Sequence, residues 1–365
     1  MVVSENLASD KNYKIELVRK GFADRKVCYD DSKTVERIIE AYNKAKQIQL
    51  KSAPEYQVSN EWLPLYRQFM GGIMDSLATR NVDRAKEIYN NFMREPCSVG
   101  LHGLPVDMFK HYFGSDITRT YKRLFLSDTL HRYNLWLSLV GQTNKVNDLE
   151  SPLIGNPYGY YFDGVFVKAG SDYLHYYATI IGRLIRSNNQ KVVMELGGGY
   201  GGMAYYLMRD NADLTYVDFD LPENLALTSY YLLTAFPDKK IALYGELDLS
   251  SSNIKDYDAV LLPNFEIETM QNNSVDLIFN SYSLAEMSRE TIVNYVSHFN
   301  RIADKFIFHV NHNRDSLVKA DEFNIDQGKF ELLYRAPALW NKGRNIDMDE
   351  FEYLYKSKKL AFNAI

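Results

Sequence analysis

The sequence is poor in cysteine and in long apolar runs, and each shortage excludes a class of protein. Cys28 and Cys97 are the only cysteines among 365 residues, so the chain can build neither a disulfide framework nor a cysteine cluster with zinc spacing. No run reaches the roughly 18 uninterrupted apolar residues that a membrane-spanning helix needs. We therefore expect two ordinary thiols and no membrane span.

Basic charge is also in short supply. The 42 Lys and Arg residues against 47 Asp and Glu give a formal net charge of -5, which does not favour nucleic acid as a partner. A small or neutral substrate fits this balance better. The amino terminus lacks the basic segment and apolar core of a secretory signal, so we expect a cytoplasmic protein.

Residues 1–150 carry apolar residues at helical spacing. The stripes are Val35, Ile38, Ile39 and Tyr42; Trp62, Leu65, Tyr66, Phe69, Ile73 and Leu77; Val82, Ala85, Tyr89 and Phe92; and Ile117, Tyr121 and Leu124. The polar stretch 141–151 then breaks the pattern. Because the chain is longer than a typical single domain, we predict an N-terminal helical domain over 1–150 that serves substrate binding or dimerisation.

In residues 151–365 the pattern changes to strands alternating with helices, which is typical of an α/β fold. Apolar runs of the kind found in buried parallel strands cover 192–196, 214–217, 241–244, 275–279 and 306–310. Helix-length segments lie among them at 202–209, 222–236 and 289–302. Residues 330–340 and 351–356 bracket the segment GRNIDMD and predict an antiparallel hairpin that closes the sheet.

The segment KVVMELGGGYGGMAYYL joins a predicted strand, an acidic residue, clustered glycines and a helix. Glycine lets the backbone turn sharply and approach a ligand, while the start of the helix offers free N–H groups and the positive end of the helix dipole. A nucleotide-like ligand fits such a turn. A turn that only packs strand on helix is the alternative.

The glycines satisfy two ligand-binding patterns. Gly197, Gly199 and Gly202 match the dinucleotide fingerprint G-x-G-x-x-G, while Glu195, Gly197, Gly199 and Gly201 match the methyltransferase pattern E-x-G-x-G-x-G. A carboxylate at Glu195 suits the cationic methionine end of S-adenosylmethionine and would repel a pyrophosphate. We favour S-adenosylmethionine, with a nicotinamide-dependent oxidoreductase as the rival.

Acidic residues after the second predicted strand supply the next test. A carboxylate about 20 residues beyond the glycines is placed to bind ribose hydroxyls. Asp220 is the first choice and Asp218 the second, unless they only cap the helix that begins near Pro222. Adenine would lie beyond the third predicted strand, where Glu246 and Asp248 are candidates.

Three segments together resemble the bacterial family of sugar O-methyltransferases: ELGGGYGG at 195–202, DLPE at 220–223 and NSYSLAEM at 280–287, and GNPYG at 155–159 is similar too. The likeness covers roughly residue 151 to the end. It implies a Rossmann-like class I methyltransferase fold, with a seven-stranded sheet and one antiparallel edge strand. It also implies methylation of a sugar hydroxyl in surface or secreted glycan synthesis. We assign Leu221 and Asn280, which lie in these motifs, to the cofactor site.

Transfer of a methyl group to a hydroxyl requires alignment of the reacting atoms and gains from a general base. Glu286 follows the fourth predicted strand, on the side of the sheet where such folds bind ligands. Small-molecule O-methyltransferases carry a catalytic histidine at about this place, so Glu286 is our first hypothesis for the base, and capping of the next helix is its alternative. His309 and His312, after the fifth strand, are also candidates because imidazole titrates near neutral pH.

The remaining hypotheses concern a metal ion, a lid and partners. No carboxylate pair near His309 and His312 completes a ligand set, so we expect no divalent ion, although dependence on one stays open. Residues 156–161 (NPYGYY) either close over the site, with Tyr158, Tyr160 or Tyr161 touching the cofactor or the sugar, or only connect the two regions. By analogy with other methyltransferases that carry helical additions, we expect a homodimer. A non-catalytic binding module is the second rival.

Overall fold

The computed structural model describes residues 10–29, 31–58, 62–98, 101, 118–141, 144–186, 191–248, 253–313, 318–341 and 349–360. Ile117 of the last helical stripe and all but the last residue of the GRNIDMD segment lie outside these ranges.

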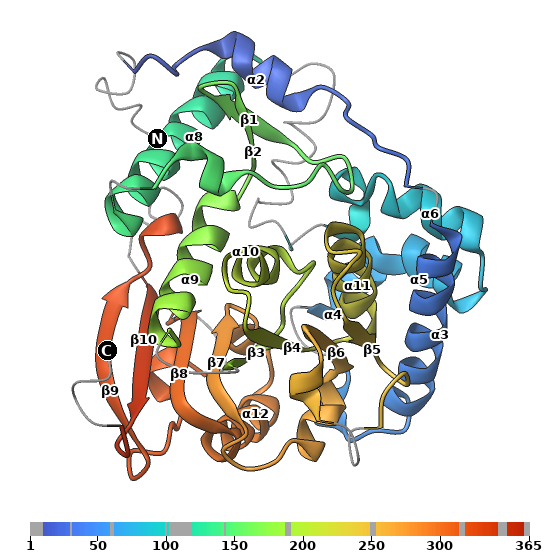
Figure 1. Ribbon diagram of the computed structural model, residues 1–365, viewed down its shortest axis with the longest axis vertical. Helices are drawn as coiled ribbons and strands as arrows, with labels where there is room; N and C mark the ends of the chain where they lie inside the picture. The colour runs from blue at the N-terminus through green and yellow to red at the C-terminus, as the bar shows by residue number, and fades with distance from the viewer. Residues whose placement is uncertain are drawn as a thin grey trace.

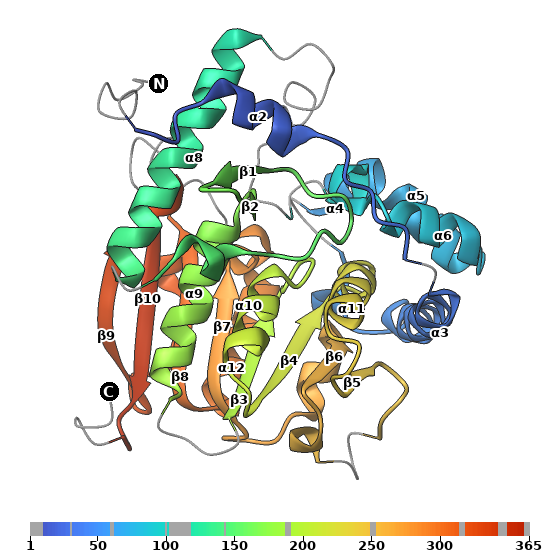
Figure 2. The ribbon, with the colours of Figure 1, turned by 45° about the horizontal axis from the view of Figure 1, so that its top comes forward.

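Helices make up most of the first part of the chain, and further helices pack on both faces of the sheet formed by the second part (Figures 1 and 2). They are α2 (Ile15–Phe22), α3 (Ser32–Gln49), α4 (Trp62–Leu65), α5 (Gly71–Ala78), α6 (Val82–Tyr89), α8 (Arg119–Val140), α9 (Ser171–Leu184), α10 (Gly202–Asp210), α11 (Pro222–Ala235) and α12 (Arg289–Ile302). None of the helices described is both long and apolar enough to cross a membrane.

Strands form a large sheet and a separate hairpin. The hairpin pairs β1 (Gly159–Phe162) with β2 (Val165–Lys168). The large sheet contains β3 (Lys191–Leu196), β4 (Leu214–Asp220), β5 (Ile241–Leu243), β6 (Ala259–Pro263), β7 (Val275–Ser281), β8 (Ala303–His312), β9 (Phe330–Pro337) and β10 (Glu350–Ser357), in the order β5-β6-β4-β3-β7-β8-β10-β9.

The large sheet is doubly wound. Helices α9, α10 and α11 cover one face and α12 lies against the other (Figure 2). Strands β3 to β8 are parallel, whereas β10 runs antiparallel to both of its neighbours. This is the Rossmann-like α/β architecture that the resemblance implied, and the predicted hairpin of β9 and β10 is confirmed.

Two details of the expected sheet are wrong. The large sheet has eight strands rather than seven, because the short β5 pairs with β6 and forms an additional edge strand. The antiparallel strand is not at an edge, since β10 lies between β8 and β9. Strand β6 was not predicted, although its apolar run 259–262 is as long as the predicted run 241–244.

Helix α3 of the N-terminal region packs on α11. Helix α3 begins where the Asp31 side chain accepts a hydrogen bond from the Thr34 N–H, a standard cap that satisfies a free backbone donor. Its stripe Val35, Ile38, Ile39 and Tyr42 is buried, as predicted, and belongs to the same hydrophobic core as α9, α10 and α11. The helical region and the sheet therefore share one core.

Strand order creates a crevice in the middle of the sheet. The chain leaves β3 toward β4 and β6 on one side and returns to β7 on the other side of β3. The helices that follow β3 and β7 consequently lie on opposite faces (Figure 2). At such a switch point the carboxyl ends of the strands form the ligand-binding edge of α/β sheets.

Tyr89 of α6 contacts Tyr230 of α11, and a substitution at Tyr89 tests how much this contact between the N-terminal helices and the sheet domain stabilises the protein. Their rings stack with centroids 4.4 Å apart, and Tyr89 is fully buried. We expect Tyr89→Ala to lower the free energy of unfolding by about 3–5 kcal/mol through loss of the ring.

Tyr89→Phe is the matched control for that measurement by chemical denaturation. The Tyr89 hydroxyl is buried and finds no hydrogen-bond partner in the described part of the chain. Removing it should leave the free energy of unfolding within about 1 kcal/mol of wild type or raise it. A small loss with Tyr89→Ala would show that the N-terminal helices do not depend on this stack.

Candidate functional site

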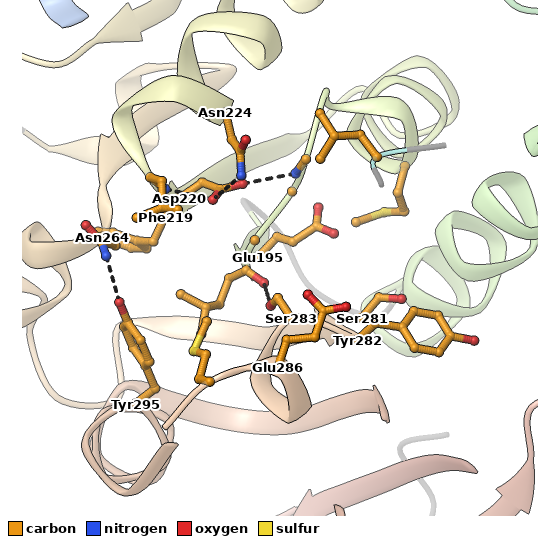
Figure 3. Close-up of a pocket in the computed structure, with 18 of the residues that line it drawn as sticks. Glu195, Phe219, Asp220, Asn224, Asn264, Ser281, Tyr282, Ser283, Glu286 and Tyr295 are labelled. Atoms are coloured by element: carbon orange, nitrogen blue, oxygen red, sulfur yellow. Dashed lines mark hydrogen bonds between the residues drawn. The ribbon is translucent and has the colours of Figure 1, made fainter. Parts of the chain in front are cut away.

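A cavity of about 420 Å³ opens at the carboxyl ends of β3, β4, β6 and β7. Figure 3 shows Asp220 and Asn264 at one end of it, Glu286 and Tyr282 at the other, and Glu195 between them. The residues that line it are Glu55, Gln57, Val58, Leu101, Arg132, Tyr173, Leu174, Glu195–Gly199, Met203, Phe219–Leu221, Asn224, Asn264, Ser281–Ser283, Glu286, Met287, Thr291, Tyr295, Trp340 and Glu350.

The glycine loop after β3 forms the floor of the cavity. Gly199 has φ 65°, a conformation that side chains with a Cβ rarely adopt, and a Cβ there would meet nothing closer than Leu101 at 3.7 Å. At Gly198 a Cβ would come within 2.8 Å of the Tyr216 hydroxyl and the Asp218 carboxyl. The loop is therefore open toward the cavity and tightly packed beneath, as a ligand-binding backbone turn requires.

Three carboxyl groups lie together around this loop. Glu195 on β3 is paired in register with Asp218 on β4, and Asp220 stands at the end of β4. The Tyr216 hydroxyl donates to Glu195 Oε2 at 2.6 Å. Burial raises the pKa of Glu195 to about 8 and that of Asp220 to about 6. Burial and the two neighbouring carboxyls also raise the pKa of Asp218, so the cluster favours protons or a cationic ligand.

The two aspartates of β4 have different positions. Asp218 is fully buried beneath the loop, where its Oδ1 accepts from the Gly198 N–H at 3.2 Å. Asp220 lines the cavity together with Leu221. Its Oδ2 accepts from the Gly199 N–H at 3.1 Å, and its Oδ1 accepts from the Leu221 N–H at 2.7 Å. Asp220 thus braces the start of α11 and also faces the cavity.

The far end of the cavity is formed by Asn264, which directly follows β6. Its amide nitrogen donates to the Tyr56 carbonyl and the Tyr295 hydroxyl at 3.1 and 3.0 Å. Its Oδ1 is buried with no hydrogen-bond partner among the described residues. Glu246 and Asp248, the sequence-based candidates for this end, are misplaced because they follow the edge strand β5. Glu246 pairs with Arg37 instead.

The loop after β7 brings Glu286 into the cavity. Glu286 ends the short 3₁₀ helix Leu284–Glu286 and is half-buried. Asn280 is fully buried and is not a lining residue. Its amide nitrogen donates to the Leu196 carbonyl at 2.9 Å and to Ser283 Oγ at 2.6 Å. Asn280 therefore ties the glycine loop to the loop that carries Glu286.

Neither candidate histidine reaches the cavity. His309 is buried against Tyr353, with ring centroids 4.5 Å apart, and burial lowers its pKa to about 3. His312 is also buried and lies beside Glu350 in the register of β8 and β10. Glu286 lines the cavity, whereas neither histidine is among its lining residues. In the part of the chain that it describes, no three His, Cys, Asp or Glu side chains gather as metal ligands.

The predicted lid is a hairpin in this structure. Residues 159–162 form β1 and pair with β2, and the pair packs on α2. Tyr158 is buried under the Arg94 guanidinium, whose central carbon lies 4.0 Å from the ring centroid. Tyr158 is not a lining residue of the cavity.

Several lining residues were not anticipated. Tyr282 has φ 65°, a strained conformation for an aromatic residue of the kind that clusters at functional sites. Its hydroxyl donates to Glu350 Oε2 at 3.2 Å. Trp340 and Tyr173 also line the cavity and add aromatic surface to it. Only Tyr282 lies in a motif that the sequence singled out.

No protein-family model matches the chain, and no curated protein sequence matches it. Solved structures align with about half of it. The small RNA methyltransferase HEN1 aligns over 51% of this chain and 25% of its own, with 11% identity and a TM-score of 0.38. A TehB-like SAM-dependent methyltransferase from Corynebacterium glutamicum covers 48% of this chain and 86% of its own, with 14% identity and a TM-score of 0.34.

A third structure is phosphoethanolamine N-methyltransferase 2 of Haemonchus contortus in complex with S-adenosyl-L-methionine. It aligns over 49% of this chain and 50% of its own, with 12% identity and a TM-score of 0.35. The chain thus spans a quarter of the first of these proteins and half of the third. Scores and identities of this size do not identify a family.

The raised pKa of Glu195 predicts a pH-dependent stability. A carboxyl whose pKa is higher in the folded than in the unfolded protein stabilises the fold at low pH, and this stability is lost as the pH rises toward about 8. Glu195→Gln cannot ionise, so its free energy of unfolding should fall less steeply between pH 5 and 8. The difference in slope is at most about 1.4 kcal/mol per pH unit.

Urea denaturation of both proteins at several pH values measures this effect. Asp218 and Asp220 contribute a dependence of the same sign to both proteins, so only the difference between the two curves reports on Glu195. Parallel curves would mean that Glu195 is ionised in the folded protein.

Proposed function

We propose that the protein is an S-adenosylmethionine-dependent O-methyltransferase that methylates a sugar hydroxyl in glycan or glycoside biosynthesis. The observation that carries the proposal is the pair Glu195 and Asp220 on either side of an open glycine loop at the switch point of the sheet. A carboxylate at each position gives acceptors for an ammonium group and for ribose hydroxyls. The loop between them leaves room for a nucleoside.

The residues around the cavity fit the parts of this cofactor. Asp220 would hold the ribose, with Leu221 and Phe219 beside the adenine ring. The unpartnered Asn264 Oδ1 is an acceptor for the exocyclic amine of adenine, because its own amide nitrogen is already committed to two protein oxygens. A buried acceptor without a donor costs free energy, and a bound adenine would supply that donor.

The rival nicotinamide cofactor fits less well. A pyrophosphate bound at the glycine loop would lie beside Glu195 and Asp220, and like charges at such short range in a buried site repel strongly. The amino acid and sulfonium groups of S-adenosylmethionine place positive charge there instead. The same two carboxyls that oppose a dinucleotide therefore favour the methyl donor.

In this proposal the protein positions the acceptor against the methyl donor and removes the proton of the acceptor hydroxyl. When bound, the cofactor supplies a methyl group on a sulfonium sulfur. Glu286 lies at the opposite end of the cavity from Asp220 (Figure 3), where it would accept the proton of the acceptor hydroxyl. Asn280 and Ser283 hold the loop of Glu286 against the glycine loop, so they fix the base relative to the cofactor. Such alignment is the main source of rate in a methyl transfer.

A sugar acceptor is supported by the surface near Glu286. Tyr282 lies at this end, and its hydroxyl donates to the carboxyl of Glu350. The aromatic side chains of Tyr173 and Trp340 also line the cavity. Aromatic rings offer apolar faces with polar edges, and carboxylates accept hydrogen bonds from hydroxyls. The motif resemblance to sugar O-methyltransferases points to the same class of acceptor.

Cofactor binding is tested by calorimetry with S-adenosylhomocysteine and with NAD. We expect the wild-type protein to bind the homocysteine compound and not NAD. Asp220→Ala should weaken binding by about 10–100-fold, since hydrogen bonds from ribose hydroxyls to a charged group are lost. The control is Asp238→Ala, an exposed residue in the turn that precedes β5. Binding of NAD alone would overturn the proposal.

Turnover tests the base. We expect Glu286→Gln to bind S-adenosylhomocysteine as wild type does and to lose about a hundredfold or more in kcat, the usual contribution of a general base. Transfer of labelled methyl from S-adenosylmethionine to free monosaccharides and nucleotide sugars measures it. The exposed Glu290→Gln on α12 is the matched control. Full turnover by Glu286→Gln would remove Glu286 from this role.

A further inference from the structure

Arg132 is the one cationic side chain among the described residues that line the cavity, which otherwise carries the carboxyls of Glu55, Glu195, Asp220, Glu286 and Glu350. It comes from α8 in the N-terminal region, far from the glycine loop in sequence. Its side chain is only 16% exposed. A largely buried guanidinium in an acidic cavity calls for an explanation.

Two carboxyls hold Arg132 in one orientation. Its Nε donates to Asp128 Oδ2 at 2.9 Å, one turn earlier on α8. Its Nη1 lies 4.0 Å from Asp172 Oδ2 in the first turn of α9. A guanidinium has five N–H donors, and the described residues supply a hydrogen-bond acceptor for Nε only. The remaining donors suit a further anion of planar shape, such as a carboxylate.

The position of Arg132 relates it to one end of the proposed cofactor. Asp220 marks the ribose end on β4, and α8 and α9 lie on the opposite side of β3, toward β7 and β8 (Figures 1 and 2). The first turn of α9 reaches the glycine loop, since a Cβ on Gly202 would lie 2.8 Å from Leu174 Cδ1. A ligand that starts at Asp220 and crosses the loop therefore runs toward Tyr173 and Arg132.

We propose that Arg132 binds the α-carboxylate at the amino-acid end of the methyl donor, while Glu195 binds its ammonium group. This inference rests on the proposed function. It assigns helix α8 to the cofactor site, so the N-terminal region completes that site in addition to any role in binding the acceptor. The methyl donor is recognised at both ends, by β4 and β6 at the nucleoside and by α8 at the amino acid.

The experiment compares two nucleosides by calorimetry. S-adenosylhomocysteine carries the amino acid, whereas 5′-methylthioadenosine has the same nucleoside and thioether without it. We expect Arg132→Gln to weaken binding of S-adenosylhomocysteine by about 10–100-fold, the range for loss of a charge-assisted pair. Binding of 5′-methylthioadenosine should stay unchanged. Arg123→Gln, an exposed arginine on the same helix, should change neither affinity.

Other outcomes overturn the proposal. An unchanged affinity of Arg132→Gln for S-adenosylhomocysteine, with a raised KM for the acceptor, would assign Arg132 to the acceptor instead. Equal weakening of both nucleosides would make Arg132 a structural residue. Should Arg132→Gln not fold, the wild-type protein decides through a third nucleoside, decarboxylated S-adenosylhomocysteine, which keeps the ammonium group and lacks only the carboxylate. The wild type must bind S-adenosylhomocysteine at least tenfold more tightly than this compound. If the wild type binds none of these nucleosides, the proposed function itself fails.

Discussion

The site depends on burying three carboxyl groups beside one another beneath a glycine loop. Glu195, Asp218 and Asp220 lie on adjacent strands, and burial raises the pKa of each. A tyrosine hydroxyl and two loop N–H groups hold them in place, but these bonds do not remove the repulsion between ionised neighbours. Without a ligand, protons lessen that repulsion. A cationic ligand can do so while the carboxyls remain ionised, and perturbed carboxyls of this kind are common at functional sites.

The strands next to this cluster were predictable because each is buried on both faces and therefore appears as a continuous apolar run. Strands β3, β4, β7 and β8 were found in this way. Strand β6 was not predicted, although it is buried throughout and its run 259–262 is as long as the predicted run 241–244. The consequence was local but important. Because β6 was not predicted, the adenine was expected beyond β5, at Glu246, and Asn264 at the end of β6 was not considered.

Within the site, sequence spacing identified the groups close to the glycine loop and failed for those brought in by tertiary packing. Glu195 and Asp220 follow from the loop and from its distance to the second strand. Asp218 and Asp220 point to the same face of β4 because strand side chains alternate. The sequence alone therefore does not show which of the two lies at the end of the strand and faces the cavity. His309 lies on a strand with both faces buried, and such a strand shows no alternation that would reveal its direction. Arg132 has no local signal at all, since its role follows from how α8 packs on α9.

One part of the cavity lining comes from central strands of the sheet and another part from loops and the C-terminal hairpin, and this division bears on specificity. The carboxyls assigned to the cofactor stand on central strands, whose positions are set by neighbours on both sides. The groups assigned to the acceptor come from the loop after β7 and from the C-terminal hairpin, namely Tyr282, Glu286, Trp340 and Glu350. Loops and hairpins tolerate changes in sequence that strands in a core do not. Under the proposed function, the same sheet would keep one cofactor while changes in these segments alter which hydroxyl reaches Glu286, and the choice of acceptor would be made at the periphery of the fold.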